Sequence, residues 1–233
     1  MISKEVKEKA LYFDVETATC TPTLEKLQEE NPRLAELWIK RANFYRNSYK
    51  ELSEFDDAMI FLEKAALEAE FSRVVCVSFG SFNEDGTIRT MSFHGKDEID
   101  ILNKTNKILN NAHIKGWKLC GHNIKGFDIS CLGKRMLYNG IIPSQNIQIW
   151  DKKPWEIPFL DTAEIFSFGN WANQKYLGLD LLACSLGIRS PKDEIKGSDV
   201  SRVFWKDENY EMIREYCERD VETVMLILGK IAI

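Results

Sequence analysis

Apolar positions along the chain repeat with two different periods, and the change from one to the other predicts strands and helices. Residues 11–17 pass from an apolar run into alternating acidic positions, as in a strand that ends at a polar edge. Residues 71–82 are rich in Val and Phe and predict a buried strand, and the turn at 83–86 leads to a partner strand at 87–94. Three strands that can pair in antiparallel fashion are therefore expected.

The second half of the chain alternates between helices and short strands. Helical spacing of apolar residues covers four segments, at residues 97–112, 126–138, 177–186 and 210–231. Short apolar strands are expected between them, at 118–121 and 158–161, and residues 190–203 are expected to be mostly loop. This order predicts an α/β fold in which helices flank a mixed β-sheet.

A stretch of different character, residues 18–70, separates the first two strands. Asn31 followed by Pro32 predicts one helix start, and the pattern from Ser53 to Asp56 predicts a second. We therefore predict an inserted helical hairpin within a single domain of residues 1–233. Its aromatic residues could stack on nucleic-acid bases or, as is more common, pack against the helices of the sheet; they are Trp38, Phe44, Tyr45 and Tyr49.

Composition narrows the class of protein. With 44% hydrophobic residues and a net charge of −5, the chain suits one substantial domain and not a protein that coats nucleic acid non-specifically. It has no apolar run long enough for a bilayer and no signal-peptide core, so no membrane association is expected. The six cysteines are scattered without metal-ligand spacing, which indicates reduced core residues in a cytoplasmic protein. Cys120 and His122 are accordingly expected to be structural.

The first candidate functional residues are Asp14 and Glu16. They are two positions apart on the first strand and should therefore share one of its faces. Two adjacent carboxylates repel each other unless a cation lies between them, and hard divalent cations prefer oxygen ligands. A strand that simply runs out into a polar turn is the ordinary alternative, because this pattern alone is common.

Two later segments carry further polar residues at the ends of secondary-structure elements. Asn123, Phe127 and Asp128 follow a short strand and lead into a helix, where Asp128 could equally be a carboxylate favoured by the helix dipole. In the last helix, Tyr216 and Asp220 are four residues apart and share a face that borders the apolar side. A carboxylate that is partly buried there needs a partner, and a metal ion would supply one.

Taken together, these residues resemble the three exonuclease motifs of the DEDD superfamily. The motifs are Asp14-x-Glu16, Asn123-x-x-x-Phe127-Asp128 and Tyr216-x-x-x-Asp220, in the order of the tyrosine variant (DEDDy). The chain is most similar to stand-alone 3′–5′ exonucleases related to the proofreading domain of family B DNA polymerases, which have a ribonuclease H-like fold. The helical stretch after the first motif is longer than in those domains.

The resemblance implies a site for two divalent ions, Mg²⁺ or Mn²⁺, held by Asp14, Glu16, Asp128 and Asp220, with the ions about 3.5–4 Å apart. It also implies that Tyr216 orients the attacking water. Thr17, Asn123 and Phe127 would hold the terminal nucleotide. The implied reaction releases nucleoside 5′-monophosphates from a free 3′ end, preferably of single-stranded DNA.

Other functions remain open at this point. A 3′–5′ exoribonuclease of similar fold would show the same motifs, because discrimination depends on contacts to the 2′ position. A nucleic-acid-binding protein without activity is disfavoured by the four carboxylates and Tyr216. A nucleotide-binding ATPase is disfavoured because the chain has no phosphate-binding Gly-x-x-x-x-Gly-Lys-Ser/Thr loop. The pathway, protein partners and oligomeric state are not predicted.

Overall fold

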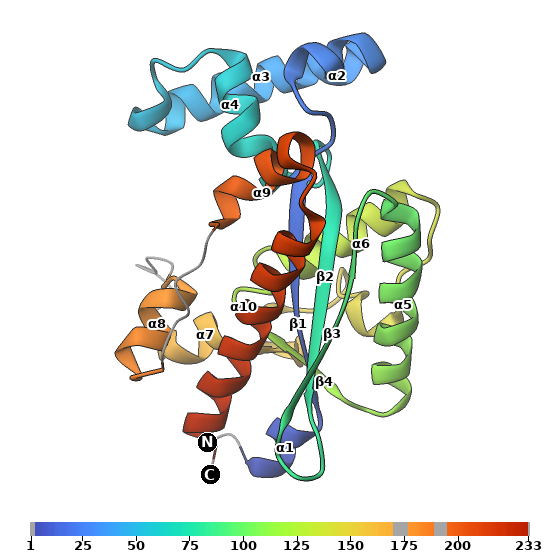
Figure 1. Cartoon of the computed structure of the whole chain (residues 1–233), viewed down its shortest axis with the longest axis vertical. Helices are drawn as coiled ribbons and strands as arrows, with labels where there is room; N and C mark the ends of the chain where they lie inside the picture. Colours follow the sequence, from blue (N-terminus) through green and yellow to red (C-terminus); the bar gives the residue numbers. More distant parts are fainter. Residues whose placement is uncertain (1–2, 170–176, 189–194, 233) are drawn as a thin grey trace.

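The computed structural model describes residues 3–169, 177–188 and 195–232, which surround a five-stranded mixed sheet (Figure 1). The strand order is β3-β2-β1-β4-β5. The strands are β1 (Ala10–Thr19), β2 (Ser72–Phe82), β3 (Ile88–His94), β4 (Lys118–Gly121) and β5 (Leu160–Asp161). The predicted α/β fold with a mixed sheet is thus confirmed.

The central strand, β1, pairs with a strand on each of its sides. It pairs antiparallel with β2, and parallel with β4, where Tyr12 lies opposite Cys120. Because β4 ends at Gly121, the second half of β1 extends past the end of β4. The loop that follows β4 therefore lies beside the acidic part of β1.

Helices cover both faces of this sheet. One face is covered by α10 (Tyr210–Ile231), which crosses β1, β2 and β3 (Figure 1). The other face carries α5 (Glu98–Ile114) and α6 (Asp128–Tyr138), and the largest apolar core lies between them and the sheet. Three further helices, α1 (Lys4–Glu8), α7 (Thr162–Ser167) and α8 (Leu179–Ser185), lie at the periphery. Among the described residues no helix is both long and apolar enough to cross a membrane.

The predicted helical hairpin at residues 18–70 is wrong in its number of helices. Three α-helices are present, α2 (Leu24–Glu30), α3 (Pro32–Ser48) and α4 (Asp57–Lys64), together with 3₁₀ turns at Lys50–Leu52 and Ala65–Leu67. The additional helix, α2, has Thr23 as its N-cap, and the Thr23 hydroxyl accepts the Lys26 N–H at 3.2 Å. Asp56, and not Ser53, caps α4 by accepting the Met59 N–H at 2.8 Å.

The insertion, residues 20–71, has an apolar core of its own and lies at the end of the sheet where β1 ends (Figure 1). Trp38 is fully buried, with its ring edge-on to Phe61 at 5.2 Å and to Phe71 at 4.9 Å. Tyr45 is also buried. These two aromatic side chains pack inside the insertion, and neither stacks on the helices of the sheet nor is available to a base.

The expected loop at 190–203 is partly helical. Residues 190–194 lie outside the described residues, but a 3₁₀ turn at Gly197–Asp199 is followed by α9 (Val200–Arg202) and a π-helical turn at Val203–Asp207. Val200, Val203 and Phe204 pack against β2 and α10 in one apolar cluster. Because these contacts come from distant parts of the chain, local periodicity does not reveal them.

Candidate active site, a carboxylate cluster at the end of the central strand

Asp14 and Glu16 project from the same face of β1, as strand alternation requires. Their carboxylate oxygens and the sulfur of Cys217 all lie within 4.8 Å of one another. Glu16 is buried, with 9% of its surface exposed, and Asp14 is partly buried. The register of β1 on β2 shifts between Glu16 and Thr17, so a strand irregularity directly follows the acidic pair.

Asp128 reaches this region because the chain turns sharply after β4. A side chain at Gly121 would lie 2.2 Å from Ile124 and 2.8 Å from the Phe13 carbonyl oxygen, so only glycine fits. Asn123 then adopts a left-handed conformation with φ of 57°, which asparagine tolerates better than most residues. Asp128 follows as the first residue of α6 and is 4% exposed.

Asp161, at the end of β5, holds the turn in place. Its carboxylate accepts the backbone N–H of Asn123 at 2.8 Å, of Lys125 at 3.1 Å and of Ala163 at 3.0 Å. The side chain is 3% exposed, so these charge-assisted bonds form away from water. Asp161 is therefore a positioning residue for the loop that carries Asn123, Phe127 and Asp128.

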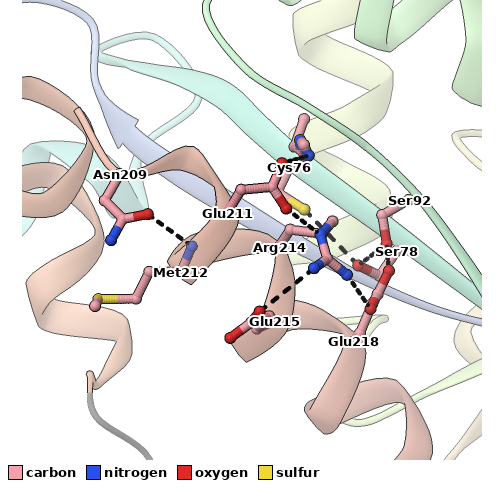
Figure 2. A network of polar contacts seen from close by, with 10 residues as sticks. Cys76, Ser78, Ser92, Asn209, Glu211, Met212, Arg214, Glu215 and Glu218 are labelled. Carbon is pink, nitrogen blue, oxygen red and sulfur yellow. Dashed lines mark hydrogen bonds and ion pairs between the residues drawn. The ribbon is translucent and has the colours of Figure 1, made fainter.

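Helix α10 brings Tyr216, Cys217 and Asp220 to the same face of the sheet. Figure 2 shows how it is anchored, with Arg214 beside Glu211, Glu215 and Glu218 on the helix surface. Glu218 accepts a hydrogen bond from Ser92 of β3 at 2.6 Å, and Ser92 is bonded to Ser78 of β2 at 2.8 Å. This series of hydrogen bonds fixes α10 against β2 and β3 beside Asp14, which lies opposite Ser78 in the sheet.

Cys217 makes a contact with Asp14 that local sequence patterns do not indicate. Its thiol donates to Asp14 Oδ2 at 3.3 Å and to the Asp14 carbonyl oxygen at 3.5 Å. Tyr216, the preceding residue, is partly buried among the residues around α9, and its hydroxyl lies 3.7 Å from where a side chain at Gly197 would begin. In the sequence Cys217 is visible only as an apolar position of α10.

The four carboxylates act on one another electrostatically. Burial, followed by the charge of Asp128, raises the pKa of Asp14 to about 7. Burial, followed by the charges of Asp161 and Asp220, raises the pKa of Asp128 to about 7. The pKa of Glu16 lies well above its ordinary range because of burial and then the charges of Asp14 and Asp220. Without a cation, then, the cluster favours protons over negative charge.

A divalent cation fits this set of residues. The Oδ1 atom of Asp128 is buried and has no hydrogen-bond partner among the described residues. Buried polar atoms are nearly always partnered, and an unsatisfied carboxylate oxygen is costly. Carboxylate oxygens from β1, α6 and α10 are the hard ligands that Mg²⁺ and Mn²⁺ prefer.

The three predicted substrate-contact residues lie around the cluster in different roles. Thr17 is buried, and its hydroxyl donates to the Ala66 carbonyl oxygen at 2.7 Å, which ties β1 to the insertion. The backbone of Asn123 is held by Asp161, and a side chain at Gly126 would collide with Asn123 Oδ1 at 2.4 Å. Phe127 is partly exposed and borders a cavity beside α6.

The Cys120–His122 pair has the structural role that was expected. His122 is buried, with Nδ1 2.8 Å from the Thr162 hydroxyl and Nε2 2.7 Å from the Leu177 carbonyl oxygen. Burial lowers the pKa of His122, which favours the neutral ring. Both ring nitrogens are engaged, so this histidine supports the β4 turn and is not a metal ligand.

A mixed sheet flanked by helices, with an acidic central strand, places the chain in the class of α/β proteins with a ribonuclease H-like exonuclease fold. Residues 64–232 match the model of a family described as predicted 3′–5′ exonucleases related to the exonuclease domain of PolB. The chain belongs to this family, and its enzyme class is that of a 3′–5′ exonuclease. The matched region contains Asn123, Phe127, Asp128, Tyr216 and Asp220, whereas β1 and most of the insertion precede it.

A solved structure of similar fold is the family B DNA polymerase from the hyperthermophilic archaeon Pyrobaculum calidifontis. The TM-score is 0.56 at 16% sequence identity, and the match covers 95% of this chain but only 24% of the polymerase chain. The chain thus corresponds to about a quarter of that protein. No curated protein matches the sequence.

Proposed function

We propose that the protein is a two-metal-ion 3′–5′ exonuclease that acts preferably on single-stranded DNA and releases nucleoside 5′-monophosphates. The observation that carries the proposal is the mutual electrostatic coupling of Asp14, Glu16, Asp128 and Asp220, with a buried unsatisfied oxygen on Asp128. Four such carboxylates from three elements are costly unless cations neutralise them.

In this proposal the four carboxylates hold two Mg²⁺ or Mn²⁺ ions. When bound, the ions would lower the pKa of a water molecule and offset the charge of the phosphate. Tyr216 orients the attacking water through its hydroxyl. Thr17, through its backbone, and Asn123 and Phe127 hold the nucleotide at the 3′ end.

A second candidate is trimming of RNA from the 3′ end. Nothing in the carboxylate cluster distinguishes the two substrates, because the distinction depends on contacts to the 2′-hydroxyl. The nucleic acid is the proposed partner in either case. The six free thiols, four of them buried, fit the reducing cytoplasm that we propose as the location.

The proposed function is tested by incubating 5′-labelled single-stranded DNA and RNA of one sequence with Mg²⁺, with Mn²⁺ and with EDTA. We expect stepwise shortening of DNA with either metal and none with EDTA. Asp14→Ala, Glu16→Ala, Asp128→Ala and Asp220→Ala should each nearly abolish the reaction and leave the protein folded. Turnover close to that of the wild type in any of these variants would remove that residue from the metal site.

A further inference from the structure

A cavity of about 420 Å³ lies between the insertion and α6, next to the carboxylate cluster. One wall comes from the insertion, with Arg41, Leu67 and Glu68, and the other from α6, with Phe127, Ser130 and Lys134. The volume is within the range of about 300–1,000 Å³ typical of small-ligand sites. Of the three, Arg41 precedes residue 64 and so lies outside the part of the chain that matches the exonuclease family, whereas Leu67 and Glu68 lie within it.

The cavity adjoins the cluster on two sides. Phe127 directly precedes Asp128, and Cys131, also in the lining, lies one helical turn further on. Burial and then the charge of Asp128 raise the pKa of Cys131 to about 12, which places its thiol within the field of that carboxylate. From the other side, the bond of Thr17 to Ala66 connects β1 to the residue before Leu67.

The insertion wall is rigidly built. Glu68 Oε1 accepts hydrogen bonds from Arg41 Nε and from the Tyr45 hydroxyl, both at 2.5 Å. Since the Glu68 side chain is only 14% exposed, these bonds lock α3 onto the turn that leads into β2. The guanidinium has further N–H donors beyond Nε, and Arg41 lines the cavity.

The chemistry of the lining suits an uncharged planar group. Each cation already has a carboxylate partner, Arg41 with Glu68 and Lys134 with Glu70 at 3.0 Å, so the walls carry no net charge. A phosphate would lie beside two carboxylates there. Phe127 and Leu67 offer apolar surfaces, while the ion pairs offer donors and acceptors at the rim. A nucleobase has these complementary properties, an apolar face and a polar edge.

We propose that this cavity binds the base of a nucleotide that flanks the scissile phosphate, so that the insertion forms part of the substrate site. The proposal rests on the proposed function and adds a specific subsite to it. Phe127 and Cys131 of the lining lie on either side of Asp128 in the sequence, so the cavity is close to the carboxylates that would face the scissile phosphate. Arg41 and Lys134 are then substrate-positioning residues, one on each wall.

The test combines point variants of the protein with DNA strands that lack one base. Ser130→Phe fills the cavity from an exposed position of α6, and Ser48→Phe is the matched control, an exposed serine of α3 that does not line the cavity. Lys134→Gln is a second variant that removes the rim cation without adding bulk. The substrates are a 5′-labelled ten-nucleotide DNA, and the same strand lacking the base of either the terminal or the penultimate nucleotide.

We expect Ser130→Phe to raise KM for the intact strand about tenfold, the order expected for one lost base–aromatic contact, with kcat within about threefold of wild type. Lys134→Gln should raise KM in the same direction. The strand that lacks the base bound in the cavity, either the terminal or the penultimate one, should show a similar rise in KM with the wild-type protein. Its KM should not rise further with Ser130→Phe. Ser48→Phe should behave as wild type. If folded Ser130→Phe and Lys134→Gln both keep the wild-type KM, the cavity is not a substrate subsite.

A binding measurement separates failure of this proposal from failure of the proposed function. Fluorescence anisotropy of the labelled strand, with Ca²⁺ in place of Mg²⁺, reports binding whether or not hydrolysis occurs. If wild-type protein hydrolyses no strand but Ser130→Phe still weakens binding about tenfold, the subsite stands and the reaction assignment fails. Equal binding of the intact and both abasic strands by wild-type protein would overturn the subsite alone.

Discussion

Replacing Asp128 with asparagine should stabilise the metal-free protein while abolishing hydrolysis. The carboxylate is 4% exposed, and one of its oxygens has no hydrogen-bond partner among the described residues. Its pKa rises from 3.8 to about 7, so above pH 7 the folded state carries an ionised group that the structure disfavours. Asparagine has nearly the same shape and no charge.

The size of the effect follows from the shift in pKa. About three pKa units correspond to ~4 kcal/mol at pH 8, at ~1.4 kcal/mol per unit. The carboxylates of the cluster titrate together, and the asparagine amide is itself costly to bury, so we assign about half of this, ~2 kcal/mol, to the substitution. For a chain of 233 residues this corresponds to a rise in Tm of about 4–8 °C.

The sign of the pH dependence is fixed by the direction of the shift. A raised carboxyl pKa means that the folded state retains a proton that the unfolded state has lost, so stability falls as pH rises from about 4 to about 7. The advantage of Asp128→Asn in Tm should therefore be about 2–3 °C at pH 5 and reach its full size at pH 8.

The assay is thermal unfolding of both proteins in EDTA and in Mg²⁺, at pH 5 and pH 8. Asp100→Asn is a matched control, since Asp100 is an exposed first-turn carboxylate of α5 paired with Lys104 at 2.6 Å. Its loss should lower stability by less than about 1 kcal/mol at either pH. If Asp128→Asn melts below wild type in EDTA at pH 8, Asp128 serves the dipole of α6 and the cluster is not under electrostatic strain.

Further expectations concern the remaining residues of the site. Mg²⁺ should raise the Tm of the wild type more at pH 8 than at pH 5.5, because Asp14 and Asp128, with pKa values of about 7, must lose protons to bind it. An equal rise in Tm at the two pH values would contradict this prediction. Tyr216→Phe should lower kcat by at most about 10²–10⁴-fold without changing Tm, and a wild-type rate would make Tyr216 a packing residue. Asp161→Ala leaves three backbone N–H groups without their acceptor, so we expect a loss of about 2–4 kcal/mol in a urea titration together with reduced turnover; unchanged turnover in the folded variant would show that the loop does not depend on Asp161.

Local patterns were sufficient for the parts of the site that depend on one element. Alternation along β1 predicted that Asp14 and Glu16 share a face, and the strand-to-helix transition predicted that Asp128 lies near the start of a helix. The mixed sheet followed from the order of elements. All of these depend on periodicity or on residues close in sequence.

Features that depend on contacts between distant segments were not predictable in this way. The thiol of Cys217 meets Asp14 because β2 and β3 anchor α10, and Asp161 supports Asn123 from another strand. The additional helix α2 and the self-contained core around Trp38 depend on packing within the insertion. The cavity between α3 and α6 also depends on contacts between distant segments, since its walls are far apart in sequence.

The polarity of hydrolysis tests the central claim most directly. A single-stranded DNA labelled at its 5′ end is incubated with Mg²⁺ beside the same strand labelled at its 3′ end, a 3′-phosphorylated strand and a single-stranded circle. A 3′–5′ exonuclease releases the 3′ label first as a mononucleotide and shortens the 5′-labelled strand stepwise, while the 3′-phosphate slows the reaction and the circle persists. Paired ends should react more slowly than single-stranded ones, because fraying costs a few kcal/mol. Cleavage of the circle, or release of the 5′ label first, would contradict this account.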